Sequence, residues 1–159
     1  SEAYAEMIYD IVLNEYISIR EPGQKMMIFA DTIEMCTYLT SFIKPRLTDL
    51  TVNRFVGEDP DEYLYESDVI ITTPKSAGTA VDIKGLKVTL LTSAIGSRQL
   101  NAQILGRLRK LRGFKDNVPR FFYLVCEDID SHVKYHERKL ATFSDKVKTH
   151  RTLQTAYVL

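Results

Sequence analysis

Apolar residues follow two different patterns along this chain. Residues 3–17 place Tyr4, Ile8 and Ile11 at helical spacing, which predicts an amphipathic helix. Five shorter runs are mainly apolar, without a regular alternation of apolar and polar residues, and have the length of buried strands. They cover residues 25–30, 50–56, 69–73, 88–92 and 121–126. Runs of this kind are typical of strands in a sheet that is covered on both faces.

Capping and breaking residues predict helices between these runs. Asp31 with Glu34 three positions later forms a capping-box pattern, and Pro45 ends the helix that follows. Residues from about 130 to 148 predict a long C-terminal helix, whose apolar stripe packs against its own domain or against a partner helix. Because helices alternate with strands, we expect residues 1–159 to form a single α/β domain with a mainly parallel sheet.

The composition is that of an ordinary globular domain. The chain has 159 residues, of which 45% are hydrophobic and 26% charged. No apolar run approaches the roughly 20 residues of a membrane span, so we expect a cytoplasmic protein with no membrane contact. Cys36 and Cys126 each lie in an apolar segment, which predicts buried free thiols rather than a disulfide.

Charge is balanced overall but unevenly distributed. Lysine and arginine number 21, as do aspartate and glutamate. Acidic residues gather between Glu58 and Asp68, whereas the segment from Ile83 to Lys115 contains basic residues and no acid. That basic segment has two interpretations, a solvated surface or a local phosphate-binding surface that the net charge hides.

Residues 98–111 predict a helix with one apolar side and one polar row. Gln103, Arg107 and Lys110 are spaced four and three apart, so they share a face. Gly106 lies beside them and costs a helix about 1 kcal/mol relative to alanine, which suggests a close approach to the backbone. An arginine on a rigid helix presents planar donors to a phosphate; the alternative is an ordinary basic surface helix.

The string Gln103-x-x-Gly106-Arg107 with Arg109 and Lys110 resembles the sixth conserved motif of superfamily 2 helicases. The resemblance implies that Gln103 and Arg107 are catalytic and face the phosphates of ATP, with Gly106 beside the nucleotide. The motif's second arginine corresponds to Lys110, while Arg109 stands one position earlier. On a continuous helix Arg107 and Arg109 point about 200° apart, so both cannot serve one phosphate.

A second string, from Thr72 to Gly78, resembles the fifth motif of the same helicases. The resemblance implies that Thr72, Thr73, Lys75 and Ser76 contact the nucleic-acid backbone. Gly78 and Asp82 would connect this loop to the ATP site, although Asp82 lies four residues after the glycine instead of the usual two. The alternative is a plain connecting loop.

Residues 25–32 and the helix after them resemble the fourth motif, so the likeness covers roughly residues 25–127 in the family's order. It implies a RecA-like, P-loop NTPase-like three-layer sandwich that acts as the second motor domain of a superfamily 2 helicase. The strings are most similar to those of phage and viral DNA helicases. If the source is a phage or virus, we expect the protein in the host cytoplasm.

The chain contains neither a G-x-x-x-x-G-K-[ST] string nor a D-E-x-H string. ATP and Mg²⁺ would therefore be held mainly by a preceding motor domain, and we expect this chain alone to be inactive. DNA, contacted without sequence preference, is the expected partner, and RNA stays open. We expect no metal site, because Cys126, His132 and His136 supply too few ligands. A non-catalytic α/β nucleic-acid-binding or regulatory module is the competing interpretation.

Overall fold

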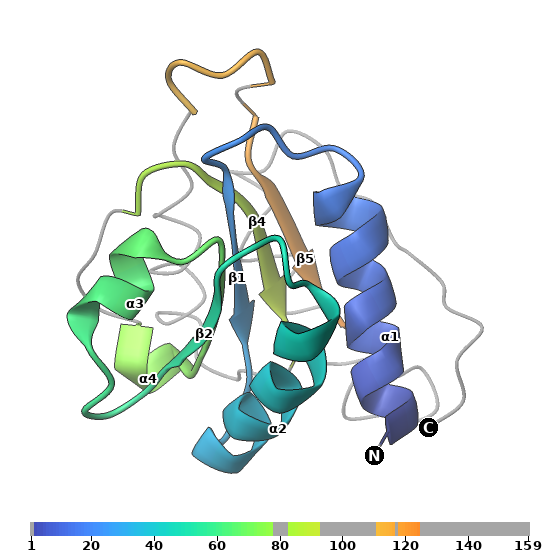
Figure 1. The fold of residues 1–159 in the computed structure, drawn as a ribbon, viewed down its shortest axis with the longest axis vertical. Coiled ribbons are helices and arrows are strands. Elements are labelled where there is room, and N and C mark those ends of the chain that lie inside the picture. The colour runs from blue at the N-terminus through green and yellow to red at the C-terminus, as the bar shows by residue number, and fades with distance from the viewer. Residues whose placement is uncertain (1, 78–82, 93–110, 117, 125–159) are drawn as a thin grey trace, which may run out of the picture.

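A computed structural model describes residues 2–77, 83–92, 111–116 and 118–124. Within these ranges five strands form one sheet, and every pair of neighbouring strands is parallel. The order across the sheet is β2-β3-β1-β4-β5, so the first strand lies in the centre (Figure 1). The strands are β1 (Lys25–Phe29), β2 (Val52–Phe55), β3 (Val69–Thr72), β4 (Leu86–Leu91) and β5 (Arg120–Tyr123).

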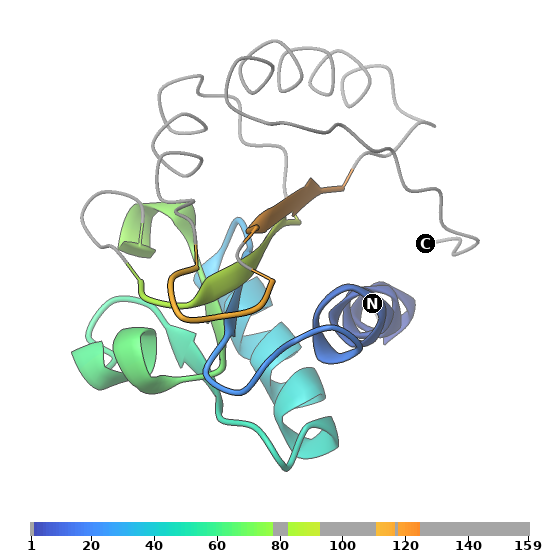
Figure 2. The same ribbon diagram turned by 90° about the horizontal axis from the view of Figure 1, so that it is seen from above.

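Helices cover both faces of the sheet. One face packs against α1 (Glu2–Val12), which continues as a π-helical turn over Leu13–Ile17, and against α2 (Ile33–Ile43), which ends in a 3₁₀ turn over Lys44–Arg46. The other face packs against α3 (Asp61–Glu66) and α4 (Pro74–Ala77). Figure 2 shows the two pairs of helices on opposite sides of the strands. The expected three-layer sandwich with a parallel sheet is therefore confirmed for the described residues.

The central strand explains why the apolar runs are continuous. Successive side chains of a strand point to opposite faces. Met26 and Ile28 belong to the core beneath α1 and α2, whereas Met27 and Phe29 belong to the core beneath α3 and α4. All four are buried. An alternating pattern of apolar and polar residues would leave one of these two cores without its central strand.

The parallel register brings the strand ends into line. Phe29, the last residue of β1, lies opposite Thr72 of β3 and Leu91 of β4. We call this end of the sheet the C-terminal edge; it lies at the bottom of Figure 1. At the opposite N-terminal edge, Gly85 adopts a φ of 78°, and a Cβ there would lie 2.7 Å from the carbonyl oxygen of Gly23. Only glycine allows these two turns to approach so closely.

Most predicted boundaries hold to within two residues, but the capping-box prediction is wrong. The N-cap of α2 is Thr32, whose hydroxyl accepts the Met35 N–H at 3.1 Å. The helix thus begins one residue later than expected, and Glu34 cannot occupy the box position. The expected N-terminal helix and the buried free thiol of Cys36 are both confirmed, whereas Cys126 lies outside the described residues.

The predicted helices over residues 98–110 and 130–148 also lie outside the described residues. Leu111, the expected last residue of the first of them, is described and is not helical. In the part of the chain that the structure describes, no helix is both long and apolar enough to span a bilayer.

One member of the predicted basic surface is a core residue instead. Lys87 is 0% exposed, and its ammonium pairs with the carboxylate of Asp116 at 2.7 Å. It occupies the buried strand β4, so it cannot contribute to a phosphate-binding surface. Lys84, Arg112 and Lys115 of the same segment are exposed.

Candidate functional site

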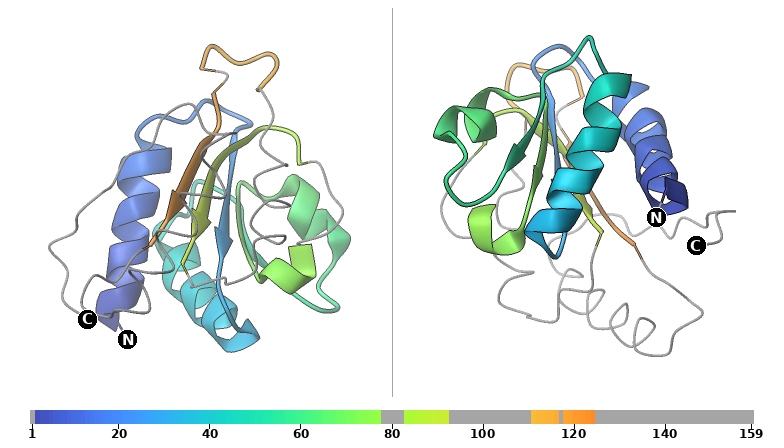
Figure 3. Two further views of the ribbon diagram at one scale, coloured as in Figure 1. Left: turned by 180° about the vertical axis from the view of Figure 1, so that it is seen from behind. Right: turned by 60° about the horizontal axis from the view of Figure 1, so that its bottom comes forward.

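The C-terminal edge contains a point where the chain leaves two neighbouring strands in opposite directions. From β1 it continues into α2 on one face, and from β3 into α4 on the other. In open parallel sheets, ligands bind in the crevice at such a switch point. The Ala30 N–H donates to the Thr72 carbonyl at 2.9 Å and ties the two exits together. The right-hand view of Figure 3 brings this end of the molecule, with α4 and the start of α2, toward the viewer.

The exit from β3 is a capped helical turn. Thr73 precedes α4, and its hydroxyl accepts the Ser76 N–H at 3.1 Å, as an N-cap residue does. The same hydroxyl donates to the Ser76 Oγ at 2.8 Å. Thr73 is only 6% exposed. Its side chain therefore shapes the turn and offers little surface to a ligand.

Lys75 and Ser76 provide the donors of this turn. Lys75 is exposed, and no carboxylate of the described residues forms an ion pair with it. Ser76 is half-buried, and because its oxygen accepts from Thr73, its own proton is available to another acceptor. An ammonium beside a hydroxyl suits contact with a phosphate that carries no sequence information.

Thr72 does not fit the contact role that the sequence suggested for it. It is 0% exposed, and its hydroxyl donates to the carbonyl of Phe55. Phe55 ends β2, so the side chain joins two strand ends inside the sheet. Thr72 thus fixes the start of the loop through its hydrogen bond with Phe55. Its hydroxyl is buried and cannot contact a phosphate.

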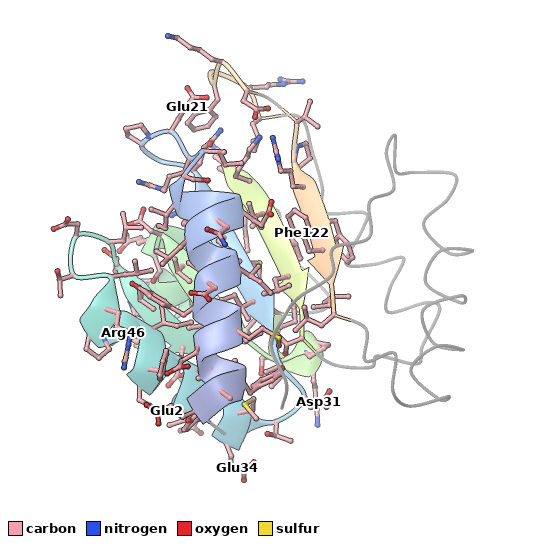
Figure 4. The ribbon with its side chains drawn as sticks, turned by 90° about the vertical axis from the view of Figure 1, so that its right-hand side faces the viewer. Glu2, Glu21, Asp31, Glu34, Arg46 and Phe122 are labelled. Carbon is pink, nitrogen blue, oxygen red and sulfur yellow. The ribbon has the colours of Figure 1, made fainter. Side chains whose placement is uncertain are left out.

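Two carboxylates border the exit from β1. Asp31 and Glu34 are both exposed, and Figure 4 shows them at the same end of the molecule. Negative charge repels phosphate, so of these two exits the one from β3, where Lys75 and Ser76 lie, is the better suited to an anionic ligand. The two strand exits therefore differ in the sign of the charge that they present.

Tyr4 and Thr92 complete the edge at the exit from β4. The Tyr4 hydroxyl donates to the Thr92 carbonyl at 3.2 Å, and the Thr92 hydroxyl donates to the Phe29 carbonyl at 2.7 Å. Burial raises the pKa of Tyr4, a shift that hydrogen bonding with the Thr92 side chain opposes and that the carboxylate of Asp31 increases. These bonds fix the point where the chain leaves β4.

Near the start of α2, Cys36 offers no reactive group. Burial raises the pKa of its thiol to about 11. The thiol is therefore protonated at neutral pH, and it is the thiolate that acts as a nucleophile.

Sequence reasoning overlooked Asp31 and Thr92 as neighbours of the site. A usable signal was present, because Asp31 directly follows one predicted strand and Thr92 is the last residue of another. In a parallel sheet the residues that follow the strands meet at one edge. The order of the strands, which the sequence does not state, decides which exits are neighbours.

The remaining predicted site residues lie outside the described residues. They are Gly78, Asp82, Gln103, Gly106, Arg107, Arg109 and Lys110. Of the predicted contact residues, the structure brings Thr73, Lys75 and Ser76 together on one turn. In the ranges that it describes, no three His, Cys, Asp or Glu side chains are grouped so that they could hold a metal ion.

No family model and no curated protein sequence matches this chain. Solved structures do match its fold. The Pyrococcus furiosus Hef helicase domain is 15% identical with a TM-score of 0.58, over 84% of this chain and 28% of that one. The Mss116p DEAD-box helicase domain 2, bound to an RNA duplex, is 20% identical with a TM-score of 0.61, over 82% and 54%.

The third match is S. cerevisiae Dbp5 bound to Gle1 and IP6, at 16% identity and a TM-score of 0.64, over 89% of this chain and 37% of that one. The chain thus spans between about a quarter and about a half of each matched protein chain. None of the three supports the expected likeness to phage and viral helicases. With its five-stranded parallel sheet and helices on both faces in the described residues, this chain has a RecA-like fold, to which these three solved structures are similar.

Proposed function

We propose that this chain is the second RecA-like motor domain of an ATP-dependent superfamily 2 helicase or translocase. The observation that carries the proposal is a RecA-like fold, matched by a DEAD-box helicase domain 2, with phosphate donors at its switch point. A first motor domain, outside this sequence, would hold most of the ATP and its Mg²⁺. The chain alone would then turn over no ATP.

On the nucleic-acid side, the turn at the exit from β3 binds the backbone. Lys75 supplies the positive charge and Ser76 a hydroxyl donor, while Thr73 caps the turn and Thr72 supports it from the sheet. Both donors bind phosphate groups and not base edges, so binding is independent of the nucleic-acid sequence. The carboxylates of Asp31 and Glu34 repel phosphate, so the nucleic-acid strand follows the side of the edge where β3 ends.

On the ATP side, Arg107 stabilises the transition state of phosphoryl transfer. A guanidinium that reaches the γ-phosphate across the cleft between two motor domains raises the rate by about 10³ to 10⁵. Gln103, four residues earlier in the sequence, would face the same phosphates, and either Arg109 or Lys110 would supply the second cation of the motif. Gly106 would lie beside the nucleotide, and Gly78 and Asp82 would connect the ATP site to the turn that carries Lys75.

DNA and RNA are both candidate ligands of this turn. The sequence strings favour DNA, whereas the matched Mss116p domain was solved with an RNA duplex. Phosphate contacts from Lys75 and Ser76 suit either polymer. DNA unwinding or branch migration is the activity that we expect. An assay with matched DNA and RNA substrates decides between the two polymers.

The decisive experiment measures nucleic-acid-stimulated ATPase activity in the intact protein that contains this chain. We expect Arg107→Ala to lower kcat by about 10³-fold or more, with ATP binding retained because the first domain holds the nucleotide. Arg112→Ala is the matched control, since Arg112 is an exposed arginine five residues further along. It should keep normal turnover.

Near-normal turnover by Arg107→Ala would refute the arginine-finger assignment. Absence of any ATPase activity in the intact protein, with nucleic-acid binding retained, would instead support a non-catalytic binding or regulatory module.

A further inference from the structure

A pocket of about 480 Å³ lies between α2 and β2, the strand at one edge of the described sheet. We call it the α2–β2 pocket; its lining residues are Thr37, Thr40, Ser41, Lys44, Pro45 and Arg54. Its volume falls in the range of roughly 300–1,000 Å³ that is usual for small-ligand sites. The pocket lies on the α2 side of the sheet, whereas Lys75 lies on α4 at the opposite side (Figure 2). It is therefore separate from the turn at the exit from β3.

Two hydrogen bonds join the helix to the strand at this pocket. The Arg54 guanidinium donates through Nη1 to the Thr37 hydroxyl at 2.9 Å, and the Lys44 ammonium donates to the Asn53 side-chain oxygen at 3.2 Å. Thr37 and Lys44 are seven residues apart, which is about 10 Å along a helix. The two bonds thus bound the pocket at its two ends, and a space of that kind suits a compact ligand.

The two ends differ in charge. The Arg54 guanidinium forms two hydrogen bonds of 2.8 Å with the carboxylate of Asp59, so its charge is compensated. Together with the bond to Thr37 these use three of its five N–H groups, and two remain for a neutral acceptor. No carboxylate of the described residues forms an ion pair with Lys44. The Lys44 end therefore carries the uncompensated positive charge of the pocket.

Hydroxyl groups lie beside Lys44. Thr40 and Ser41 precede it by four and three residues, so the three side chains share one side of the helix. Their hydroxyls donate to the carbonyls of Cys36 and Tyr38, each at 2.7 Å. In an α-helix those carbonyls also accept the N–H four residues further on. Both hydroxyls can therefore turn toward a ligand without leaving a carbonyl unpaired.

We propose that the α2–β2 pocket binds a small phosphate monoester with a hydroxylated body, of the sugar-phosphate class. The phosphate lies at Lys44, which attracts it as a point charge, and Thr40 and Ser41 donate to it. A phosphate offers three acceptor oxygens to these three donors, whereas a carboxylate offers two. The hydroxyls of the body accept the remaining N–H groups of Arg54. This site is independent of the proposed motor function.

A nucleic-acid backbone fits this pocket less well than a small ester. Glu58 and Asp61 flank Asp59 in the chain, and both are exposed. A strand that left the pocket at the Arg54 end would meet their carboxylates, which repel phosphate. A small ester places its only phosphate at the Lys44 end, away from that charge.

The test is calorimetric titration of the intact protein with ribose 5-phosphate, ribose and inorganic phosphate. We expect ribose 5-phosphate to bind more tightly than either of the others, because it occupies both ends of the pocket. Lys44→Gln keeps a donor for Asn53 but loses the charge, so it should weaken the binding of ribose 5-phosphate by about 10-fold or more. Ser41→Ala should weaken it by about threefold or more and gives a second measurement at the same end.

Two further variants locate the ligand. Lys84→Gln removes an exposed lysine at the N-terminal edge and should leave every affinity unchanged. Arg54→Lys keeps a positive charge beside Asp59 but loses the planar donors, so it should weaken the binding of ribose 5-phosphate and not that of inorganic phosphate. Melting temperatures of all variants show that each is folded at the assay temperature.

Three results would overturn the inference. The first is ribose 5-phosphate that does not bind, or that binds Lys44→Gln as tightly as the unmodified protein. The second is inorganic phosphate that binds as tightly as ribose 5-phosphate, since the body would then make no contact. The third is a short DNA or RNA strand that displaces ribose 5-phosphate and loses affinity in Lys44→Gln, which would assign the pocket to a nucleic-acid backbone.

Discussion

Replacement of Lys75 by alanine tests the nucleic-acid side of the site directly. Lys75 is exposed, and no described residue pairs with its ammonium. Its removal should therefore change stability by less than about 0.5 kcal/mol. If the ammonium neutralises one phosphate, the slope of log affinity against log salt becomes shallower by about 0.9 for a duplex or about 0.7 for a single strand.

This slope sets the size of the effect at each salt concentration. Between about 50 and about 200 mM salt, one phosphate contact on a duplex accounts for roughly a 3.5-fold change in affinity. The affinity lost by Lys75→Ala should therefore be about 3.5-fold larger at the lower concentration. Fluorescence anisotropy with labelled DNA and RNA, titrated at four or more salt concentrations, measures both the slope and the polymer preference.

The matched control is Lys84→Ala. Lys84 is also exposed but lies beside Gly85 at the N-terminal edge, so it alters the net charge equally and leaves the β3 exit intact. We expect its slope to equal that of the unmodified protein. Equal slopes for Lys75→Ala and the unmodified protein would refute a phosphate contact, and equal shifts in both variants would mean that only the overall charge matters.

Three further substitutions test the fold around the site. Thr73→Ala should lower the free energy of unfolding by about 1 kcal/mol, because the N-cap of α4 is lost. Thr73→Ser keeps a capping hydroxyl and should restore that free energy, which urea denaturation measures. Gly85→Ala should destabilise by about 2 kcal/mol or more, whereas Gly57→Ala, with a φ of 53° but open space around it, should cost less; equal losses would contradict the close-approach argument. The Arg54 hydrogen bond lowers the pKa of Asp59, so the pair stabilises the folded protein above the ordinary aspartate pKa of about 4. That stabilisation is lost as the pH falls from there through the lowered pKa of Asp59. Asp59→Asn should reduce the acid-induced loss of stability, and an unchanged pH profile would show that the pair contributes nothing.

The nature of the elements follows from local sequence. Continuous apolar runs such as Lys25–Phe29 identify buried strands because only a sheet covered on both faces accepts them. The breaks at Pro45 and between the runs separate them into α/β units. Local patterns place an element's end only to within a residue or two, as the N-cap of α2 shows. Asp31 and Thr32 can both cap a helix, and in the structure the N-cap is Thr32.

The roles of individual polar residues depend on tertiary structure. Thr72 and Lys75 stand three positions apart in one string, yet the sheet buries the first and leaves the second exposed. Lys87 looked like part of a basic surface until its pairing with Asp116, 29 positions away, placed it in the core. Local sequence specifies which elements form, because propensity and periodicity act over a few residues. The order of the strands decides which exits meet at the switch point and which charges are buried, because those contacts join residues far apart in the chain.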